Sequence, residues 1–128
     1  MKIVKRNCDS AEIELRGDYI HVQFKDMSII DEDEAKIVAD HIVDLCDKKA
    51  LPFITNGLGI TIRMNNSARN FFAQYKPLLD VRKGQALLVN NMPSKLLAGF
   101  YIKYHKPADP TKIFTNFDEA LKWIRSLN

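Results

Sequence analysis

Apolar and polar residues alternate along two short segments near the N-terminus. Residues 11–15 and 19–24 each show the two-residue period of a half-buried strand, and the segment 16–18 between them is suited to a turn. The pattern therefore predicts a β-hairpin. A helical period follows over residues 31–47. Acidic residues crowd its first turn, where their negative charge stabilises the helix by interacting with the positive end of the helix dipole. Its apolar stripe consists of Ala35, Val38, Ala39, Ile42 and Cys46.

Strands and helices alternate through the rest of the chain. Apolar runs predict strands at 51–55 and 85–89, and residues 60–64 are either a continuation of the first or a second short strand. Helices are expected from the capping residues 65–67 to near Pro77 and from Pro93 to Tyr104. In the second of these helices, Gly99 is expected to allow a close approach.

The last element is a short strand at 113–114 that runs into a helix. The spacing of Asn116 and Glu119 is that of a capping box, in which side chains satisfy the first free N–H groups of a helix. The complete order is β-β-α-β-α-β-α-β-α, which favours parallel strands joined by crossovers. We expect an α/β fold whose mixed sheet carries an N-terminal hairpin and is covered by helices. One domain spans 1–128, with residues 1–8 as a short polar leader.

Composition places the chain among ordinary globular domains. It has 128 residues, of which 46% are hydrophobic and 27% charged. No apolar run reaches the roughly 20 residues that span a bilayer, and the N-terminus lacks the apolar core of a signal peptide. We therefore expect a cytoplasmic protein without membrane insertion, in which Cys8 and Cys46 are free thiols.

The formal net charge of +3 is unevenly distributed. Residues 1–75 carry ten Lys/Arg and twelve Asp/Glu, whereas residues 76–128 carry nine Lys/Arg and four Asp/Glu. A basic half can attract acidic partners, but here the basic residues are dispersed and the aromatic residues fall at core spacing. We therefore expect an ordinary solvated face and no binding of nucleic acid.

The sequence contains no recognisable catalytic or cofactor-binding constellation. The histidines at 21, 41 and 105 lack the carboxylate or cysteine neighbours of a metal site. There is no nucleophile elbow, and the Gly-containing segment 56–59 lacks the P-loop lysine and the dinucleotide-binding spacing. We expect no metal, no cofactor and no enzymatic activity.

Three segments of the chain together carry a resemblance to known proteins. The first is Ser67-Ala-Arg-Asn-Phe-Phe-Ala. The second is Ala86-Leu-Leu-Val followed by Pro93-Ser-Lys-Leu-Leu-Ala-Gly-Phe-Tyr, and the third runs from Lys106-Pro through Lys112-Ile-Phe-Thr to Glu119-Ala-Leu-Lys-Trp-Ile. These segments resemble a family of small bacterial STAS-like, or SpoIIAA-like, proteins of unassigned function. The resemblance covers nearly the whole domain and implies the fold of the anti-sigma-factor antagonists. Its positions are mostly packing and capping residues, which say little about chemistry.

The resemblance also implies one candidate regulatory position. Antagonists of this type carry a phosphorylatable serine in an Asp-Ser-Ser-Gly stretch, and Ser67 lies at the equivalent turn. Asn65, Asn66 and Ala68 replace the other three residues of that stretch. Phosphate there would meet the free N–H groups of a helix start, with Arg63 and Arg69 beside it. The alternative is that Ser67 or Asn66 is simply an N-cap.

Aromatic residues on two predicted helices form a second candidate site. They suit an apolar pocket or an interface, and they are Phe71, Phe72, Tyr75, Phe100, Tyr101 and Tyr104.

Two functions remain open. The first is a non-catalytic regulatory or scaffolding module that binds a protein partner, with a homodimer among the options. The second is a carrier of a small molecule or lipid with an apolar pocket.

Overall fold

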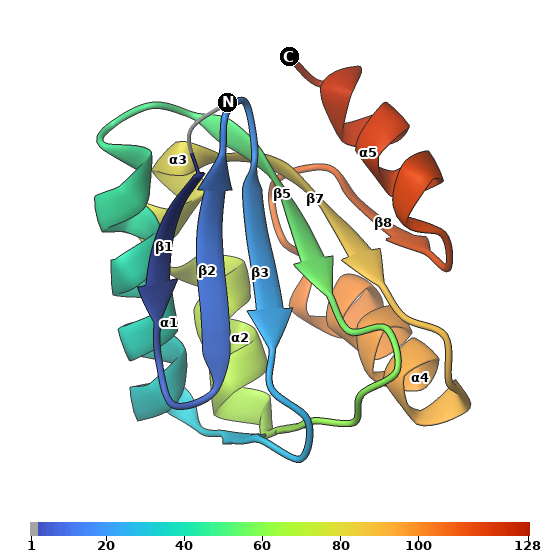
Figure 1. The fold of residues 1–128 in the computed structure, drawn as a ribbon. Coiled ribbons are helices and arrows are strands. Elements are labelled where there is room, and N and C mark those ends of the chain that lie inside the picture. The colour runs from blue at the N-terminus through green and yellow to red at the C-terminus, as the bar shows by residue number, and fades with distance from the viewer. Residues whose placement is uncertain (1–2) are drawn as a thin grey trace.

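The computed structural model describes residues 3–128 and contains a six-stranded mixed sheet (Figure 1). Its strands are β1 (Ile3–Asn7), β2 (Ala11–Arg16), β3 (Ile20–Phe24), β5 (Leu51–Asn56), β7 (Arg82–Leu88) and β8 (Thr111–Phe114). They lie side by side in the order β1-β2-β3-β5-β7-β8. The first three pair antiparallel, and β3, β5, β7 and β8 pair parallel. The α/β class, the mixed sheet and the N-terminal hairpin are thus confirmed.

Strand β1 corrects the prediction of a polar leader over residues 1–8, of which the first two lie outside the described residues. Ile3 to Asn7 pair with β2, opposite Arg16 to Glu12. The strand lies at the edge of the sheet and carries Lys5 and Arg6. It therefore lacks the alternation of apolar and polar residues that predicted the next two strands. Cys8, which follows it, is buried rather than lying in a polar tail.

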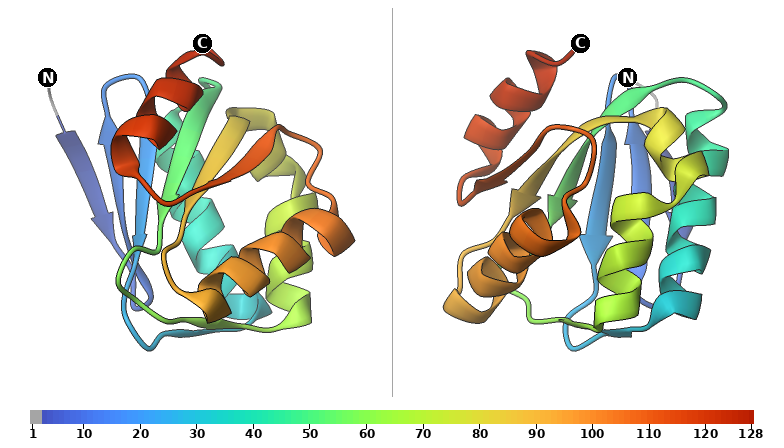
Figure 2. Two further views of the ribbon diagram at one scale, coloured as in Figure 1. Left: turned by 90° about the vertical axis from the view of Figure 1, so that its right-hand side faces the viewer. Right: turned by 180° about the vertical axis from the view of Figure 1, so that it is seen from behind.

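Helices cover the two faces of the sheet unequally. In Figure 2, α1 to α4 lie on one face, whereas α5 packs alone on the other. This division matches the two clusters of buried side chains, since the larger includes residues of α1, α2 and α3 and the smaller includes Ala120 and Ile124 of α5. The helices are α1 (Glu32–Cys46), α2 (Asn66–Gln74), α3 (Lys76–Val81), α4 (Met92–Phe100), a π-helical segment η1 (Tyr101–His105) and α5 (Phe117–Arg125).

Two short elements refine the predicted order. Residues 60–64 do not extend β5, and the alternative of a second short strand is confirmed at residues 63–64, outside the main sheet. Instead β6 (Arg63–Met64) pairs with β4 (Ile29–Ile30) as a separate two-stranded sheet. Helix α3 was not predicted, because Pro77 was interpreted as the end of the preceding helix. Here the proline instead lies in the first turn of a new helix, where its missing N–H is not needed.

Aspartate and asparagine side chains cap α1, α2 and α5, and the predicted cap at Asn116 is confirmed. Asp31 accepts a hydrogen bond from the Glu34 N–H at the start of α1, and Asn116 accepts one from the Glu119 N–H at the start of α5. The cap of α2 is Asn65, whose Oδ1 accepts from Ala68 N at 2.8 Å. The alternative that Ser67 or Asn66 is the N-cap was therefore wrong by one or two residues.

Two glycines differ in the space around them. A Cβ atom on Gly84 in β7 would lie 2.6 Å from Leu127 Cδ1 and 3.1 Å from the Pro110 carbonyl oxygen, so this strand and the C-terminus approach closely. A Cβ atom on Gly99 would meet nothing within 4 Å. The prediction that another element approaches α4 closely at Gly99 is therefore wrong, because this position of the helix has open space beside it.

Both cysteines are free thiols, as predicted, and both are buried. Burial raises the pKa of the Cys46 thiol to about 12.

Within residues 3–128, no helix has the length and apolar character that crossing a bilayer requires.

Candidate functional site

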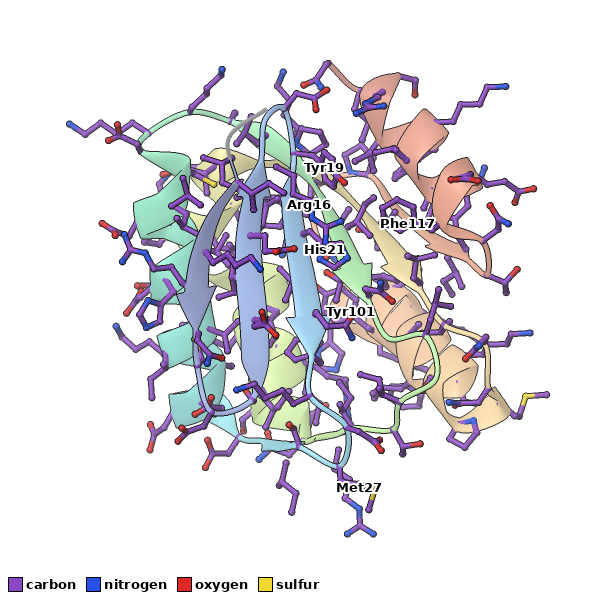
Figure 3. All side chains as sticks on the ribbon, in the orientation of Figure 1. Arg16, Tyr19, His21, Met27, Tyr101 and Phe117 are labelled. Atoms are coloured by element: carbon purple, nitrogen blue, oxygen red, sulfur yellow. The ribbon has the colours of Figure 1, made fainter. Side chains whose placement is uncertain are left out.

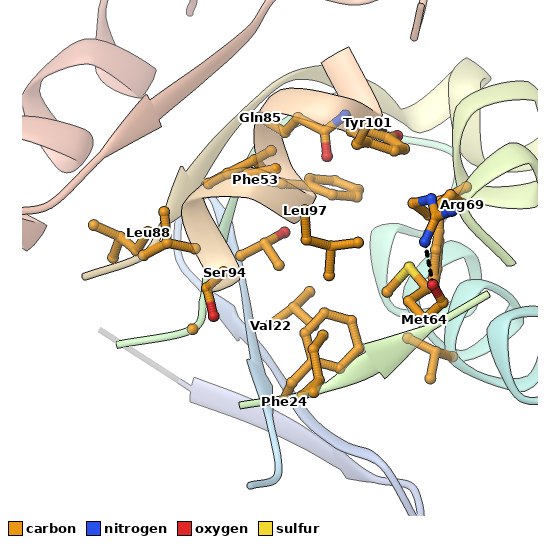
Figure 4. Close-up of a pocket in the computed structure, with 18 of the residues that line it drawn as sticks. Val22, Phe24, Phe53, Met64, Arg69, Gln85, Leu88, Ser94, Leu97 and Tyr101 are labelled. Atoms are coloured by element: carbon orange, nitrogen blue, oxygen red, sulfur yellow. Dashed lines mark hydrogen bonds between the residues drawn. The ribbon is translucent and has the colours of Figure 1, made fainter. Parts of the chain in front are cut away.

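An apolar cavity of about 120 Å³ lies between the parallel strands and helix α4 (Figure 4). Val22 and Phe24 of β3 line one end of it in that view, and Phe53 of β5 and Leu97 of α4 lie nearer the middle. The walls come from β3, β5, β7, α1, α2, α4 and η1 together. Helix α4 forms one side of the cavity, and Ala98 is its one buried residue.

Polar side chains gather at the other end of the cavity. Gln85 of β7 donates through Nε2 to the Tyr101 hydroxyl and to Thr111 Oγ1, at 3.3 Å each. Arg82, which also lines the cavity, forms a two-point ion pair with Asp109, with Nε and Nη2 at 2.8 and 2.9 Å from the carboxylate oxygens. Burial raises the pKa of the Tyr101 hydroxyl, so this group stays protonated.

Sequence reasoning did not select Gln85 or Arg82. The available signal was a single polar residue at the start of the apolar run 85–89, in a strand predicted to be central. A glutamine buried in the middle of a sheet needs partners for its amide, and these partners come from η1 and β8. Both elements are distant in sequence, which is why the pattern alone did not reveal the polar end.

Arg69 lies at the side of the cavity and is already engaged. Its guanidinium donates to the Met64 carbonyl and, through Nε, to His105 Nε2 at 3.3 Å, and its Cζ lies 5.7 Å from the centre of the Phe100 ring. Burial, followed by the charge of Arg69, lowers the pKa of His105. Arg69 therefore ties α2 to η1, whereas it was expected to meet an anion beside Ser67.

The remaining residues of the predicted turn are at the surface. Arg63, Asn66 and Ser67 are exposed, and Asn65, also exposed, caps α2 through its side chain. Ser67 is the second residue of α2 and so lies in the first turn of that helix. Met64 and Arg69, which flank this turn in the sequence, both line the cavity.

Four of the six candidate aromatic residues belong to the larger buried cluster, or pack against it. Phe72 and Tyr101 are buried and line the cavity. Phe71 and Tyr75 stack on each other with ring centres 4.4 Å apart, and the Tyr75 hydroxyl donates to Asp40 of α1 at 2.8 Å. The third pair, Phe100 and Tyr104, is exposed.

Helix α4 and segment η1 present an exposed apolar stripe, which we call the α4 ridge. Its members follow at intervals of four residues, which places neighbours on one side of a helix. They are Met92, Leu96, Phe100 and Tyr104, exposed by 66%, 66%, 48% and 58%. The rings of Phe100 and Tyr104 have centres 4.2 Å apart. Leu97, next to Leu96 in the sequence, instead lines the cavity, so α4 is apolar on two sides.

A second polar cluster lies on the opposite face of the sheet, near α5. Figure 3 shows His21 of β3 beside Arg16 and Tyr19, with Phe117 of α5 close by. Asn56 accepts the Leu58 N–H through Oδ1, so its Nδ2 donates to His21 Nε2 at 3.3 Å. The ring proton of neutral His21 is thus on Nδ1, which lies 3.7 Å from Glu14 Oε1.

No described residue accepts the hydrogen bond that this Nδ1–H could donate. Glu14 Oε1 instead accepts from Arg16 Nε at 2.8 Å. Burial, and after it the charge of Arg16, lowers the pKa of His21 to about 4. The alternation of β3 placed His21 opposite Ile20 and Val22, as observed, but it did not indicate how deeply the ring is buried.

Among residues 3–128, no group of three or more His, Cys, Asp and Glu side chains is arranged to hold a metal ion. The candidate sites among these residues are an apolar cavity with one polar end, an exposed apolar ridge and a polar helix start.

A family model described as "Domain of unknown function (DUF7793)" matches residues 13–128. The chain belongs to this family. No curated protein matches it. The fold is similar to that of an uncharacterised protein of the DUF3478 family from Shewanella loihica PV-4, whose crystal structure is described as having a SpoIIAA-like fold. The two share 8% sequence identity with a TM-score of 0.59, over 96% of this chain and 92% of the other.

This similarity confirms the SpoIIAA-like fold that the sequence resemblance implied. An identity of 8% carries the fold and no function.

Proposed function

We propose that this chain is a non-catalytic regulatory or scaffolding module that binds a protein partner through the α4 ridge and the neighbouring start of α2. The observation that carries the proposal is the exposure of four large apolar side chains in succession on one helix. Contiguous apolar surface is uncommon on monomeric domains and is characteristic of interaction sites. Arg69, whose guanidinium lies against Phe100, connects the ridge to the start of α2.

Charge around the ridge indicates the chemistry of the partner. Between residues 82 and 108 the chain has five Lys or Arg residues and no Asp or Glu. Lys95 and Lys103 are exposed on the helical segment itself, and Lys103 Nζ lies 5.5 Å from the centre of the Tyr104 ring. A partner surface with an apolar centre and an acidic rim is complementary to this arrangement. A two-fold dimer through the ridge would instead bring lysines of both copies together, which disfavours self-association at this surface.

Ser67 supplies a candidate switch for the same surface. A phosphoryl group on this exposed hydroxyl would lie in the first turn of α2, where the helix dipole favours negative charge. It would also place negative charge close to an acidic partner. We therefore expect modification of Ser67 to weaken partner binding, as would the variant Ser67→Glu, whereas Ser67→Ala leaves binding intact.

The test begins with a partner screen by proximity labelling with the wild-type chain and with Leu96→Asp. Ile37→Asp is the matched control, because Ile37 is also an exposed apolar residue, on α1. Each recovered protein is then purified, and its affinity is measured by calorimetry. We expect the Leu96→Asp variant to bind at least tenfold more weakly and the control variant to bind normally, with affinity falling as salt is raised.

Several results would overturn the proposal. They are the recovery of no partner, equal loss of binding in both variants, or an affinity that does not depend on Leu96. Association of the wild-type chain with anionic lipid vesicles in place of any protein would show that the ridge is a membrane-contact surface. Dimerisation that Leu96→Asp abolishes would make a second copy the partner. Equal affinities for Ser67→Glu and Ser67→Ala would refute the switch alone.

The cavity favours a second candidate function, a small-molecule carrier. An apolar cavity with convergent polar groups is the usual form of a ligand site. Its volume of about 120 Å³ is below the range of roughly 300–1,000 Å³ that holds drug-sized ligands, which argues against a lipid. This function is independent of the ridge, because the two use opposite sides of α4.

A further inference from the structure

We propose that the cavity beneath α4 binds a small, uncharged, monocyclic molecule that carries one hydroxyl group, with the hydroxyl directed toward Gln85 and Tyr101. The inference rests on the second function proposed above and names the class of ligand. Three properties of the cavity support it: its size, the hydrogen-bonding groups at its polar end and the state of its charges.

Size limits the ligand to about one ring. An engineered cavity of about 150 Å³ lined by leucine, isoleucine and phenylalanine binds benzene. The cavity here is about 120 Å³ and is walled by the same kinds of side chain, including Phe53, Leu87 and Leu97. A six-membered ring fits such a volume, whereas a long acyl chain does not.

The polar end offers one acceptor and one donor. Both hydrogens of Gln85 Nε2 are used, toward Tyr101 and Thr111. Within residues 3–128 the Oε1 atom of Gln85 accepts no hydrogen bond, and Figure 4 shows it directed into the cavity. The Tyr101 oxygen accepts from Gln85, which leaves its own O–H to be donated. A hydroxyl group both donates and accepts, so it satisfies Gln85 Oε1 and the Tyr101 O–H together.

The cationic groups of the cavity are already engaged, which favours an uncharged ligand. The Arg82 side chain is 2% exposed and is neutralised by Asp109. A carboxylate at this end would therefore face an arginine that already has an anionic partner, and it would approach Asp109 itself. Arg69 is directed to the Met64 carbonyl and to His105.

The experiment measures affinities of four probes for the whole chain by methyl-detected NMR titration. The probes are phenol, toluene, benzoate and decanoate. We expect phenol to bind about tenfold more tightly than toluene, because two added hydrogen bonds contribute roughly that factor. We expect no binding of decanoate, and weaker binding of benzoate than of phenol.

Two variants locate the site. Gln85→Leu removes the acceptor, so phenol should lose its advantage while toluene still binds. Leu97→Phe fills the cavity from α4 and should abolish binding of both. If Gln85→Leu does not fold, the selectivity of the wild-type chain and the Leu97→Phe variant decide the matter.

The outcomes separate the ligand class from the carrier function. Tighter binding of decanoate or benzoate than of phenol would overturn the proposed class and leave a carrier function standing. Equal binding of phenol and toluene would refute the role of Gln85 and Tyr101. Unchanged binding in Leu97→Phe would place the ligand elsewhere. Binding of no probe at all would refute both the class and the carrier function.

Discussion

His21 makes the stability of this domain depend on pH, and the effect can be isolated by replacing that one residue. The ring is 4% exposed, its Nε2 accepts from Asn56, and its Nδ1–H faces Glu14 without a hydrogen bond. A second proton would have to enter at Nε2, where the Asn56 amide already donates. Protonation of His21 would therefore create a buried charge and break the hydrogen bond from Asn56 that joins β3 to β5.

The magnitude follows from the pKa of His21 in the two states. That pKa is about 4 in the folded chain against 6.5 for an unperturbed histidine. As the pH falls below 6.5, the unfolded chain takes up the proton first, so the stabilising contribution is complete above pH 6.5 and is lost toward pH 4. The whole difference corresponds to about 3 kcal/mol of unfolding free energy, of which about 2 kcal/mol is lost between pH 7 and pH 5.

Urea denaturation of the wild type and of His21→Gln at pH 7 and pH 5 tests this value. The quantity to compare is the change in unfolding free energy between the two pH values, so a lower overall stability of the variant does not matter. We expect that change to be smaller in His21→Gln by about 2 kcal/mol. His41→Gln is the control and should behave like the wild type. An identical pH dependence for wild type and His21→Gln would refute the reasoning.

Two further predictions concern packing and the buried ion pair, and both are measured as unfolding free energies by urea denaturation. Gly84→Ala should destabilise by about 1–2 kcal/mol because its Cβ would lie 3.1 Å from the Pro110 carbonyl oxygen, a backbone atom that is harder to displace than the end of the Leu127 side chain. Gly99→Ala should stabilise by about 0.5–1 kcal/mol because the position is open and helical. A loss of stability in both would contradict this. Asp109→Ala should destabilise by about 3 kcal/mol, since it leaves the Arg82 guanidinium buried without its partner. A change below 1 kcal/mol would mean that Arg82 finds other contacts.

The elements that sequence reasoning predicted well are those whose periodicity reflects burial on one side. The stripe of α1 is buried from Ala35 to Cys46, and the Asn116 cap of α5 forms as its spacing indicated. The misplaced elements are those in which local pattern and tertiary context disagree. β1 is an edge strand with charged residues, and α3 carries in its first turn a proline that also suits the end of the preceding helix.

The candidate site was less accessible to sequence reasoning, because its parts are joined by contacts across the fold. Gln85 meets Tyr101 and Thr111 only when β7, η1 and β8 are assembled. The direction of Arg69 depends on the position of His105, far away along the chain. A stripe of apolar residues on α4 could be recognised, but a sequence does not reveal which of its two apolar sides stays uncovered.

The position of β1 at the sheet edge bears on aggregation. An edge strand leaves backbone groups free to pair with another chain, and the lysine and arginine of β1 discourage that pairing through charge repulsion. The family model begins at residue 13, so a chain shortened to its limits would lose β1 and the first residues of β2. The new edge would carry the fully buried Ile13 without a covering strand, and such a chain should precipitate at concentrations where the longer one stays dissolved.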